Sequence, residues 1–129
     1  LPARFLTPHQ AQASPEAYAT VVAGMRLAVT KGTATELNRT SYPVCGKTGT
    51  AENAGKDHSA FIGFAPMNHP KIAIAVYIEH GGFGADMAAP IAGLIMEEYL
   101  KGRLSPRSLA TAKRLERMQT LEKRVSSTK

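Results

Sequence analysis

The stretch Cys45-Gly46-Lys47-Thr48-Gly49-Thr50 places two glycines and a lysine among small residues, where the chain changes from helix-like to strand-like patterns. A polar segment at 52–57 follows it, and then come two apolar runs at 59–65 and 71–78. This order predicts that residues 47–50 belong to the first strand of a three-stranded antiparallel meander. Glycine weakens a strand and often marks the close approach of a ligand or another backbone. The pattern by itself fits equally a weak edge strand with a solvated lysine.

The run 71–78 is the clearest strand, because its apolar side chains alternate between two faces. One face carries Ile72, Ile74, Val76 and Ile78, and the other carries Ala73, Ala75 and Tyr77. Since both faces are apolar, the sequence predicts a covering helical layer on each.

Two helices are expected around this sheet. Ser14-Pro15-Glu16 has the residue types that begin a helix, here at about 15–31. A second helix is expected from about 88 to 100, with Asp86 as its cap and Gly102 at its end. Between them, residues 33–39 are expected to form a loop or a short helical turn. The side chains expected in the core are Tyr18, Val21, Val22, Met25 and Val29 in the first helix and Ile91, Leu94, Ile95 and Tyr99 in the second.

The predicted fold class is therefore α+β, with an antiparallel sheet of three strands flanked by helices. Three strands and two helices provide too little wall for a catalytic cleft, so we expect residues outside this chain to complete a larger sheet. The expected division of the 129 residues is a folded portion at 1–102 and a basic tail at 103–129.

All of the net charge of +6 lies in the tail, which contains eight basic residues and only two acidic ones, Glu116 and Glu122. A nucleic-acid surface would need that charge on the folded body beside base-stacking aromatic residues, so the sequence predicts no nucleic-acid partner. Ser105-Pro106 again resembles a helix start. The tail is either frayed and solvated, or a helix docked on its own domain or on an acidic or membrane surface through Leu109, Ala112, Leu115, Met118 and Val125.

Side chains that bind metals are scattered along the chain. The histidines at positions 9, 58, 69 and 80 show no ligand spacing, and Cys45 is the single cysteine, so we expect no metal, no cofactor and no internal disulfide. No apolar run reaches the roughly 18 residues that a membrane-spanning helix needs.

These segments together resemble a known family. Lys47-Thr48-Gly49-Thr50 is similar to the K-T-G element of the penicillin-recognising serine enzymes. Gly32-Thr33-Ala34 upstream, the runs 58–66 and 72–79, and Ala88-Ala89-Pro90-Ile91-Ala92 resemble the segments around that element. The likeness covers about 1–102 and is greatest to class B penicillin-binding proteins of the cell-elongation type, often called penicillin-binding protein 2, of which this chain resembles the C-terminal portion.

The resemblance implies a D,D-transpeptidase that cross-links peptidoglycan stem peptides through an acyl-serine and is acylated by β-lactams. Lys47 would supply a fixed positive charge, and Thr48 would donate to the substrate carboxylate. Gly49 would let the substrate backbone lie against the strand edge, and the N–H of Thr50 would be one oxyanion donor. The implied catalytic residues are Lys47 and Thr50, and the substrate-binding residues are Thr48, Gly49 and Thr50.

The nucleophile that this chemistry needs has no convincing candidate here. The only S-x-x-K spelling is Ser126-Ser127-Thr128-Lys129, at the end of the basic tail, and no S-x-N triplet occurs. We therefore expect both motifs to come from another segment of the same transpeptidase, and the chain alone to be inactive. The alternatives are a serine β-lactamase or β-lactam sensor domain, and a non-enzymatic binding module. His58 and Glu52 are expected to be ordinary polar residues, and Cys45 a packing residue.

The remaining expectations rest on the resemblance alone. It implies that the parent protein is anchored in the inner membrane with this domain in the periplasm. Its implied partners are the peptidoglycan stem peptide, β-lactam antibiotics, and a glycan polymerase with the elongation machinery that sets cell shape.

Overall fold

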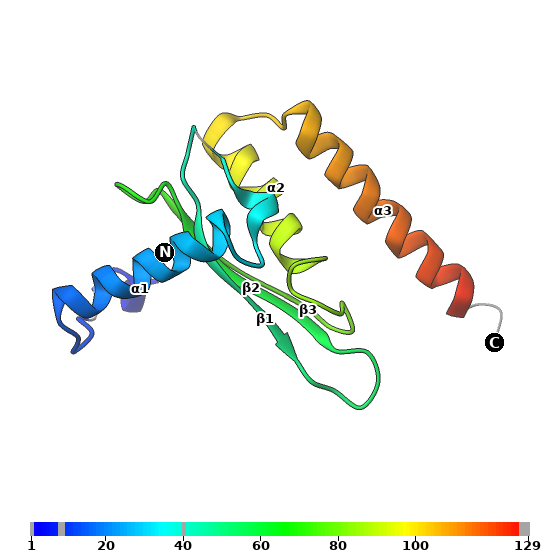
Figure 1. The fold of residues 1–129 in the computed structure, drawn as a ribbon, viewed down its shortest axis with the longest axis horizontal. Coiled ribbons are helices and arrows are strands. Elements are labelled where there is room, and N and C mark those ends of the chain that lie inside the picture. Colours follow the sequence, from blue (N-terminus) through cyan, green and yellow to red (C-terminus); the bar gives the residue numbers. More distant parts are fainter. Residues whose placement is uncertain (1, 8–9, 40, 127–129) are drawn as a thin grey trace.

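The computed structural model describes residues 2–7, 10–39 and 41–126, with side chains described as far as residue 118 (Figure 1). The α-helices are α1 (Pro15–Thr30), α2 (Ala88–Lys101) and α3 (Pro106–Ser126), and the strands are β1 (Cys45–Ala51), β2 (His58–Ala65) and β3 (Ile72–Ile78). Two short 3₁₀ helices are η1 (Ala3–Phe5) and η2 (Thr35–Leu37). The α+β class, the three strands and the positions of the first two helices are as the sequence predicted.

The sheet is an antiparallel meander in the order β1-β2-β3. Its register places Thr48 opposite Phe61, and Phe61 opposite Val76. Directly opposed residues share a face, so these three point toward α2. The neighbouring row of Lys47, Ile62 and Ala75 points to the other face.

Helix α2 covers the first of these faces through its smallest residues, so the expected buried stripe of α2 is wrong. Ile95 and Tyr99 are 46% and 64% exposed. The side of α2 that packs on the sheet instead carries Ala88, Ala89, Ala92, Gly93 and Met96. Small side chains let the helix axis approach the sheet closely, and that gain in packing outweighs the larger apolar area of the opposite stripe.

The start of α2 also differs from the prediction, because Asp86 does not cap it. Met87 occupies the cap position and makes no side-chain cap bond. The hydroxyl of Ser59, in β2, accepts from the N–H of Ala88 and donates to the carbonyl of Phe83, both at 3.0 Å. A strand residue thus satisfies the first turn of the helix. The end is as expected, with Gly102 left-handed at φ 68°.

Helix α1 begins as predicted, since the Ser14 hydroxyl accepts from the N–H of Ala17. Its expected core stripe is only partly buried: Val29 is fully buried, whereas Tyr18 and Val21 are 49% and 59% exposed. Figure 1 shows the reason, because the first half of α1 extends past the edge of the sheet. Tyr77 on the same sheet face is 57% exposed, so within the described residues this second face lacks the full helical layer that the sequence predicted.

The glycines of β1 and β2 make room for one aromatic ring. Phe61 is 1% exposed. A Cβ built on Gly46 or on Gly63, which pair across the strands, would come within 2.8 Å of its ring atoms. Gly46 in the opening stretch is therefore explained by packing inside this chain.

Adding a methyl group at Gly46, next to the Phe61 ring, tests this packing. Gly46→Ala should destabilise the chain by about 1–3 kcal/mol, the usual cost of overpacking a filled core. Gly24→Ala is the matched control, because a Cβ at Gly24 meets nothing within 4 Å. Because Gly24 lies in the middle of α1, Gly24→Ala should raise the free energy of unfolding by about 0.5–1 kcal/mol. Urea unfolding measures both, and equal stability of the two variants would contradict the packing role of Gly46.

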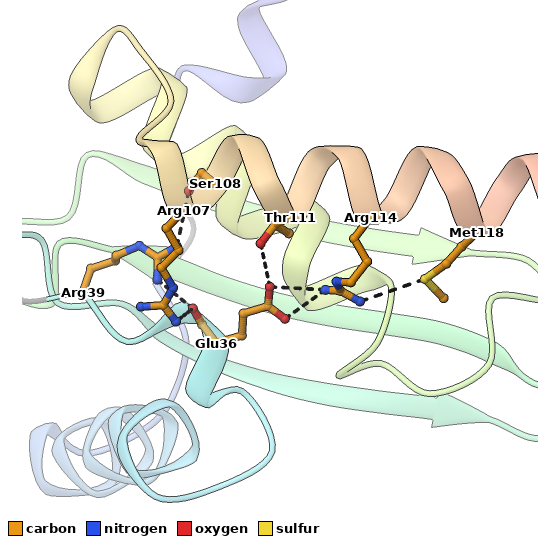
Figure 2. A network of polar contacts seen from close by, with 7 residues as sticks. All are labelled: Glu36, Arg39, Arg107, Ser108, Thr111, Arg114 and Met118. Carbon is orange, nitrogen blue, oxygen red and sulfur yellow. Dashed lines mark hydrogen bonds and ion pairs between the residues drawn. The ribbon is translucent and has the colours of Figure 1, made fainter.

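Helix α3 docks on the body of the domain, which favours the docked alternative over a frayed tail for its described part. Figure 2 shows its polar contacts with the η2 turn. Arg114 pairs with the Glu36 carboxylate at 3.1 Å, and Thr111 donates to the same carboxylate at 2.9 Å. Arg107 donates to the Glu36 carbonyl at 3.1 Å. Leu115 is 8% exposed but Leu109 is 49% exposed, so only part of the expected apolar stripe packs. Val125 lies outside the described side chains.

A second contact joins α3 to α2 through a buried carboxylate. Glu97 is 6% exposed and accepts a short hydrogen bond from the hydroxyl of Ser108. Burial raises the pKa of the Glu97 carboxyl, but the Ser108 and Ser105 hydroxyls and the positive charge of Arg39 outweigh burial and hold it below its usual value. The ionised form is therefore bound into the folded state.

This lowered pKa predicts an acid-sensitive contribution to stability. A carboxylate whose folded-state pKa is depressed stabilises the protein above its ordinary pKa, and that contribution is lost as the pH falls through the folded-state pKa. Glu97→Gln should cost about 1–3 kcal/mol at pH 7. The difference from the unaltered chain should shrink below pH 4.5, the ordinary value of the group. Thermal unfolding across pH, with exposed Glu98→Gln as control, measures it. A stability difference between Glu97→Gln and the unaltered chain that does not change with pH would contradict the role of the charge.

Candidate functional site

The residues singled out in the sequence lie along the free edge of the sheet. In the described part of the chain, β1 pairs only with β2, so its other edge meets no strand. Lys47 and Thr50 are exposed and Gly49 is partly exposed, whereas Thr48 is 8% exposed. Residues in sequence along one strand alternate in direction, so Lys47 and Gly49 face one side and Thr48 and Thr50 the other.

Lys47 places a positive charge beside this edge of β1. Its Nζ donates to the carbonyl of Thr48 at 2.5 Å, which folds the side chain back along the strand. Within the described residues no carboxylate pairs with it. An uncompensated cation beside unpaired backbone groups attracts an anionic ligand.

The two glycines of the stretch have different surroundings. The ring of Phe61 occupies the space that a side chain at Gly46 would need. A Cβ on Gly49, in contrast, would meet only the Cβ of Ala60, at 3.4 Å. On the α2 side, Gly84 packs against the backbone of the Gly49–Ala60 pair. Gly49 is thus supported from one side and open on the side of Lys47.

Thr48 has a partner that the sequence reasoning did not assign. The hydroxyls of Thr48 and Thr33 lie 2.6 Å apart. Thr33 belongs to the loop that joins α1 to η2. The sequence offered one weak signal, a small hydroxyl-bearing residue directly after Gly32, which follows the Lys31 cap of α1.

The comparison with known families shows which family this chain belongs to. The profile of the family described as the penicillin binding protein transpeptidase domain matches residues 6–97. This chain belongs to that family.

Relatives of this transpeptidase-family chain include proteins of the penicillin-binding protein 2 type that the sequence resembled. The peptidoglycan D,D-transpeptidase MrdA of Haemophilus influenzae is 36% identical over an alignment that covers 50% of this chain and 12% of that protein. MrdA of Acinetobacter baumannii is 38% identical and covers 49% and 12%. The chain therefore spans only about an eighth of the length of these curated relatives.

Solved structures of family members have the same fold. PBP2 of Pseudomonas aeruginosa, in complex with WCK 5153, has a TM-score of 0.65 at 36% identity, over 77% of this chain and 23% of the other. Penicillin-binding protein A of Mycobacterium tuberculosis, as an imipenem acyl-enzyme, has a TM-score of 0.63 at 32% identity, over 72% and 21%. Relatives of this transpeptidase-family chain thus include proteins with β-lactam acyl-enzyme structures.

His58 lies in a small cluster of rings at the start of β2, opposite Ala51 at the end of β1. Its Nδ1 accepts from the N–H of His80 at 2.9 Å, and its ring lies 5.5 Å from that of Tyr77. An imidazole nitrogen already used as an acceptor for the backbone is poorly placed to take a proton from substrate. Within the described residues, no group of three His, Cys, Asp or Glu side chains could hold a metal ion, and no helix is long and apolar enough to cross a membrane.

Cys45 shares the face of Lys47 but is fully buried. Burial raises the pKa of its thiol, and the positive charge of Arg26 opposes this only in part. Arg26 in α1 also donates to the Val44 carbonyl at 2.9 Å, which fixes the entry to β1. Cys45 is therefore held as an inert thiol.

This placement predicts low reactivity for Cys45. Iodoacetamide at pH 7.5 should modify it slowly in the folded chain and quickly in urea, because only the thiolate of an exposed cysteine reacts fast. Mass spectrometry over time measures both rates. Modification of the folded chain at the rate seen in urea would contradict the buried position.

Proposed function

We propose that this chain contributes the K-T-G strand of a peptidoglycan D,D-transpeptidase, which cross-links cell-wall stem peptides through an acyl-serine intermediate and is acylated by β-lactams. The observation that carries the proposal is the free edge of β1, where the Lys47 cation lies beside the open side of Gly49. Membership of the transpeptidase family supports it.

Each residue of the edge has one task in this proposal. The positive charge of Lys47 attracts the terminal carboxylate of a stem peptide or antibiotic and favours deprotonation of neighbouring groups. The hydroxyl of Thr48 donates to that carboxylate. Gly49 lets the substrate backbone lie along the edge as an added strand. The N–H of Thr50 is one oxyanion donor, a contact worth about 3 kcal/mol in the transition state.

The serine, its lysine and the S-x-N element come from another segment of the same transpeptidase in this proposal. The open face of Ile62 and Tyr77, 57% exposed each, is compatible with further protein packed beside the edge. The parent protein is anchored in the inner membrane, holds this domain in the periplasm and works with a glycan polymerase of the elongation machinery.

Removing the charge of Lys47 tests the proposal. In the complete polypeptide that contains this chain, Lys47→Ala should lower the second-order rate constant of acylation by a fluorescent penicillin by about 10- to 1000-fold, the scale of losing one electrostatic contact in an active site. Lys71→Ala, an exposed lysine just before β3, is the matched control and should leave the rate unchanged.

Three outcomes separate this function from the alternatives. Unchanged β-lactam binding by the complete polypeptide after Lys47→Ala would favour a non-enzymatic binding module. Rapid release of hydrolysed antibiotic by the unaltered polypeptide would favour a β-lactamase, and a stable acyl-enzyme without peptide cross-linking would favour a sensor domain. Labelling of the 129-residue chain alone would refute a nucleophile supplied from elsewhere.

A further inference from the structure

The contact between Thr33 and Thr48 lies where the chain crosses the free edge of β1. The loop that carries Thr33 runs from the end of α1 to η2, and η2 contacts both α1 and α2. Those two helices lie on opposite faces of the sheet, so the loop must pass around the edge between them. The crossing brings the Thr33 hydroxyl to 2.6 Å from that of Thr48.

Both ends of this loop are held in place, so the contact is built into the fold. Ala34, directly after Thr33, is 1% exposed and its N–H donates to the Ala28 carbonyl at 3.0 Å. Leu37 in η2 is 2% exposed. Glu36 between them is the residue that accepts from Thr111 and Arg114 of α3 (Figure 2).

A pair of hydroxyls shares its protons in one of two ways. Each hydroxyl has one proton to donate and can also accept. If Thr48 donates to Thr33, its proton is used inside the protein. If Thr33 donates to Thr48, the Thr48 proton is free for a third group. A nearby carboxylate favours the second arrangement, because a hydrogen bond to a charged acceptor is stronger than one between two hydroxyls.

We propose that Thr33 is a positioning residue that donates to the Thr48 hydroxyl and thereby orients its proton toward the carboxylate of the bound substrate or β-lactam. The proposal rests on the function proposed above and adds to it a residue outside the K-T-G element. Thr33 fixes the side-chain rotamer of Thr48 and polarises its O–H bond, as linked hydrogen bonds do.

Two ligands that differ only in charge provide the test. In the complete polypeptide, acylation is measured with benzylpenicillin and with its carboxamide, in which a neutral amide replaces the carboxylate. Thr33→Val should lower the second-order rate constant about 10-fold for the carboxylate, the scale of one hydrogen bond to a charged group. It should change the rate for the carboxamide by less than about 3-fold, since a neutral amide gains far less from an oriented donor.

The same measurements separate an effect on ligand binding from an effect on the acylation step. The carboxylate is held in both the ground and the transition state, so the loss should lie in the half-saturating concentration of benzylpenicillin, with little change in the limiting acylation rate. Thr33→Ser keeps a hydroxyl and should restore the rate to within about 3-fold. Thr35→Val is the matched control, because Thr35 is an exposed threonine two residues away.

Each other result overturns the inference. Equal losses for both ligands would make Thr33 a support for the strand and not for the carboxylate. No loss in Thr33→Val while Lys47→Ala remains impaired would refute the role of Thr33 and leave the proposed function standing. No loss in either variant would refute the function itself. If Thr33→Val unfolds, Thr33→Ala combined with Thr48→Val decides, and additive losses would contradict a shared hydrogen bond.

Discussion

The ring of Phe61 holds the sheet and its covering helix in one arrangement. It lies on the bare backbone of Gly46 and Gly63, on the face that α2 covers, and it is 1% exposed. Because neither glycine has a side chain, the ring fits over the backbone of both strands, and the alanines of α2 belong to the same buried cluster. Ser59 then joins the first turn of α2 to β2, so the helix cannot slide along the strands without losing both hydrogen bonds.

Helix α1 covers only part of the opposite face, so Ile62 and Tyr77 stay exposed there, and the outer edge of β1 meets no strand in the described part of the chain. At its Cys45 end β1 is held by α1, where Arg26 donates to the Val44 carbonyl at 2.9 Å and Cys45 is fully buried. On the opposite face a Cβ at Gly49 would meet only the Cβ of Ala60, and the neighbouring Lys47 side chain is held by the Thr48 carbonyl. In the function proposed above, an edge that the fold already holds in place loses less entropy when a ligand binds.

Helix α3 adds a second, electrostatic layer of organisation beyond the span matched by the family. Its ion pair with Glu36 is partly exposed and worth about 0.2–1 kcal/mol by itself. The buried Glu97–Ser108 contact is more costly to break, since it would leave a charge without its donor. The Glu97–Ser108 contact ties the tail to α2, and the Glu36 contacts tie it to η2, the same turn that ends the loop carrying Thr33.

The order of residues along the chain was enough to predict the local structure and the family resemblance. Alternation in 71–78 predicted the two faces of β3, Ser14-Pro15 and Gly102 marked helix ends, and K-T-G with its flanking runs identified the transpeptidase resemblance. It also put Lys47 and Gly49 on one strand. All of these depend on residues close together in the chain, where periodicity and capping chemistry act directly.

Which surfaces meet became clear only from the packing of segments that are remote in the chain. Periodicity showed that α2 has a large-residue stripe and a small-residue stripe, but close packing over Phe61 selected the small one. Ser59 replaced Asp86 at the start of α2, Thr33 met Thr48 across 15 residues, and Arg114 met Glu36 across 78. The free energy of such contacts depends on shape and distance between remote segments, and neither quantity is written in the local pattern of residues.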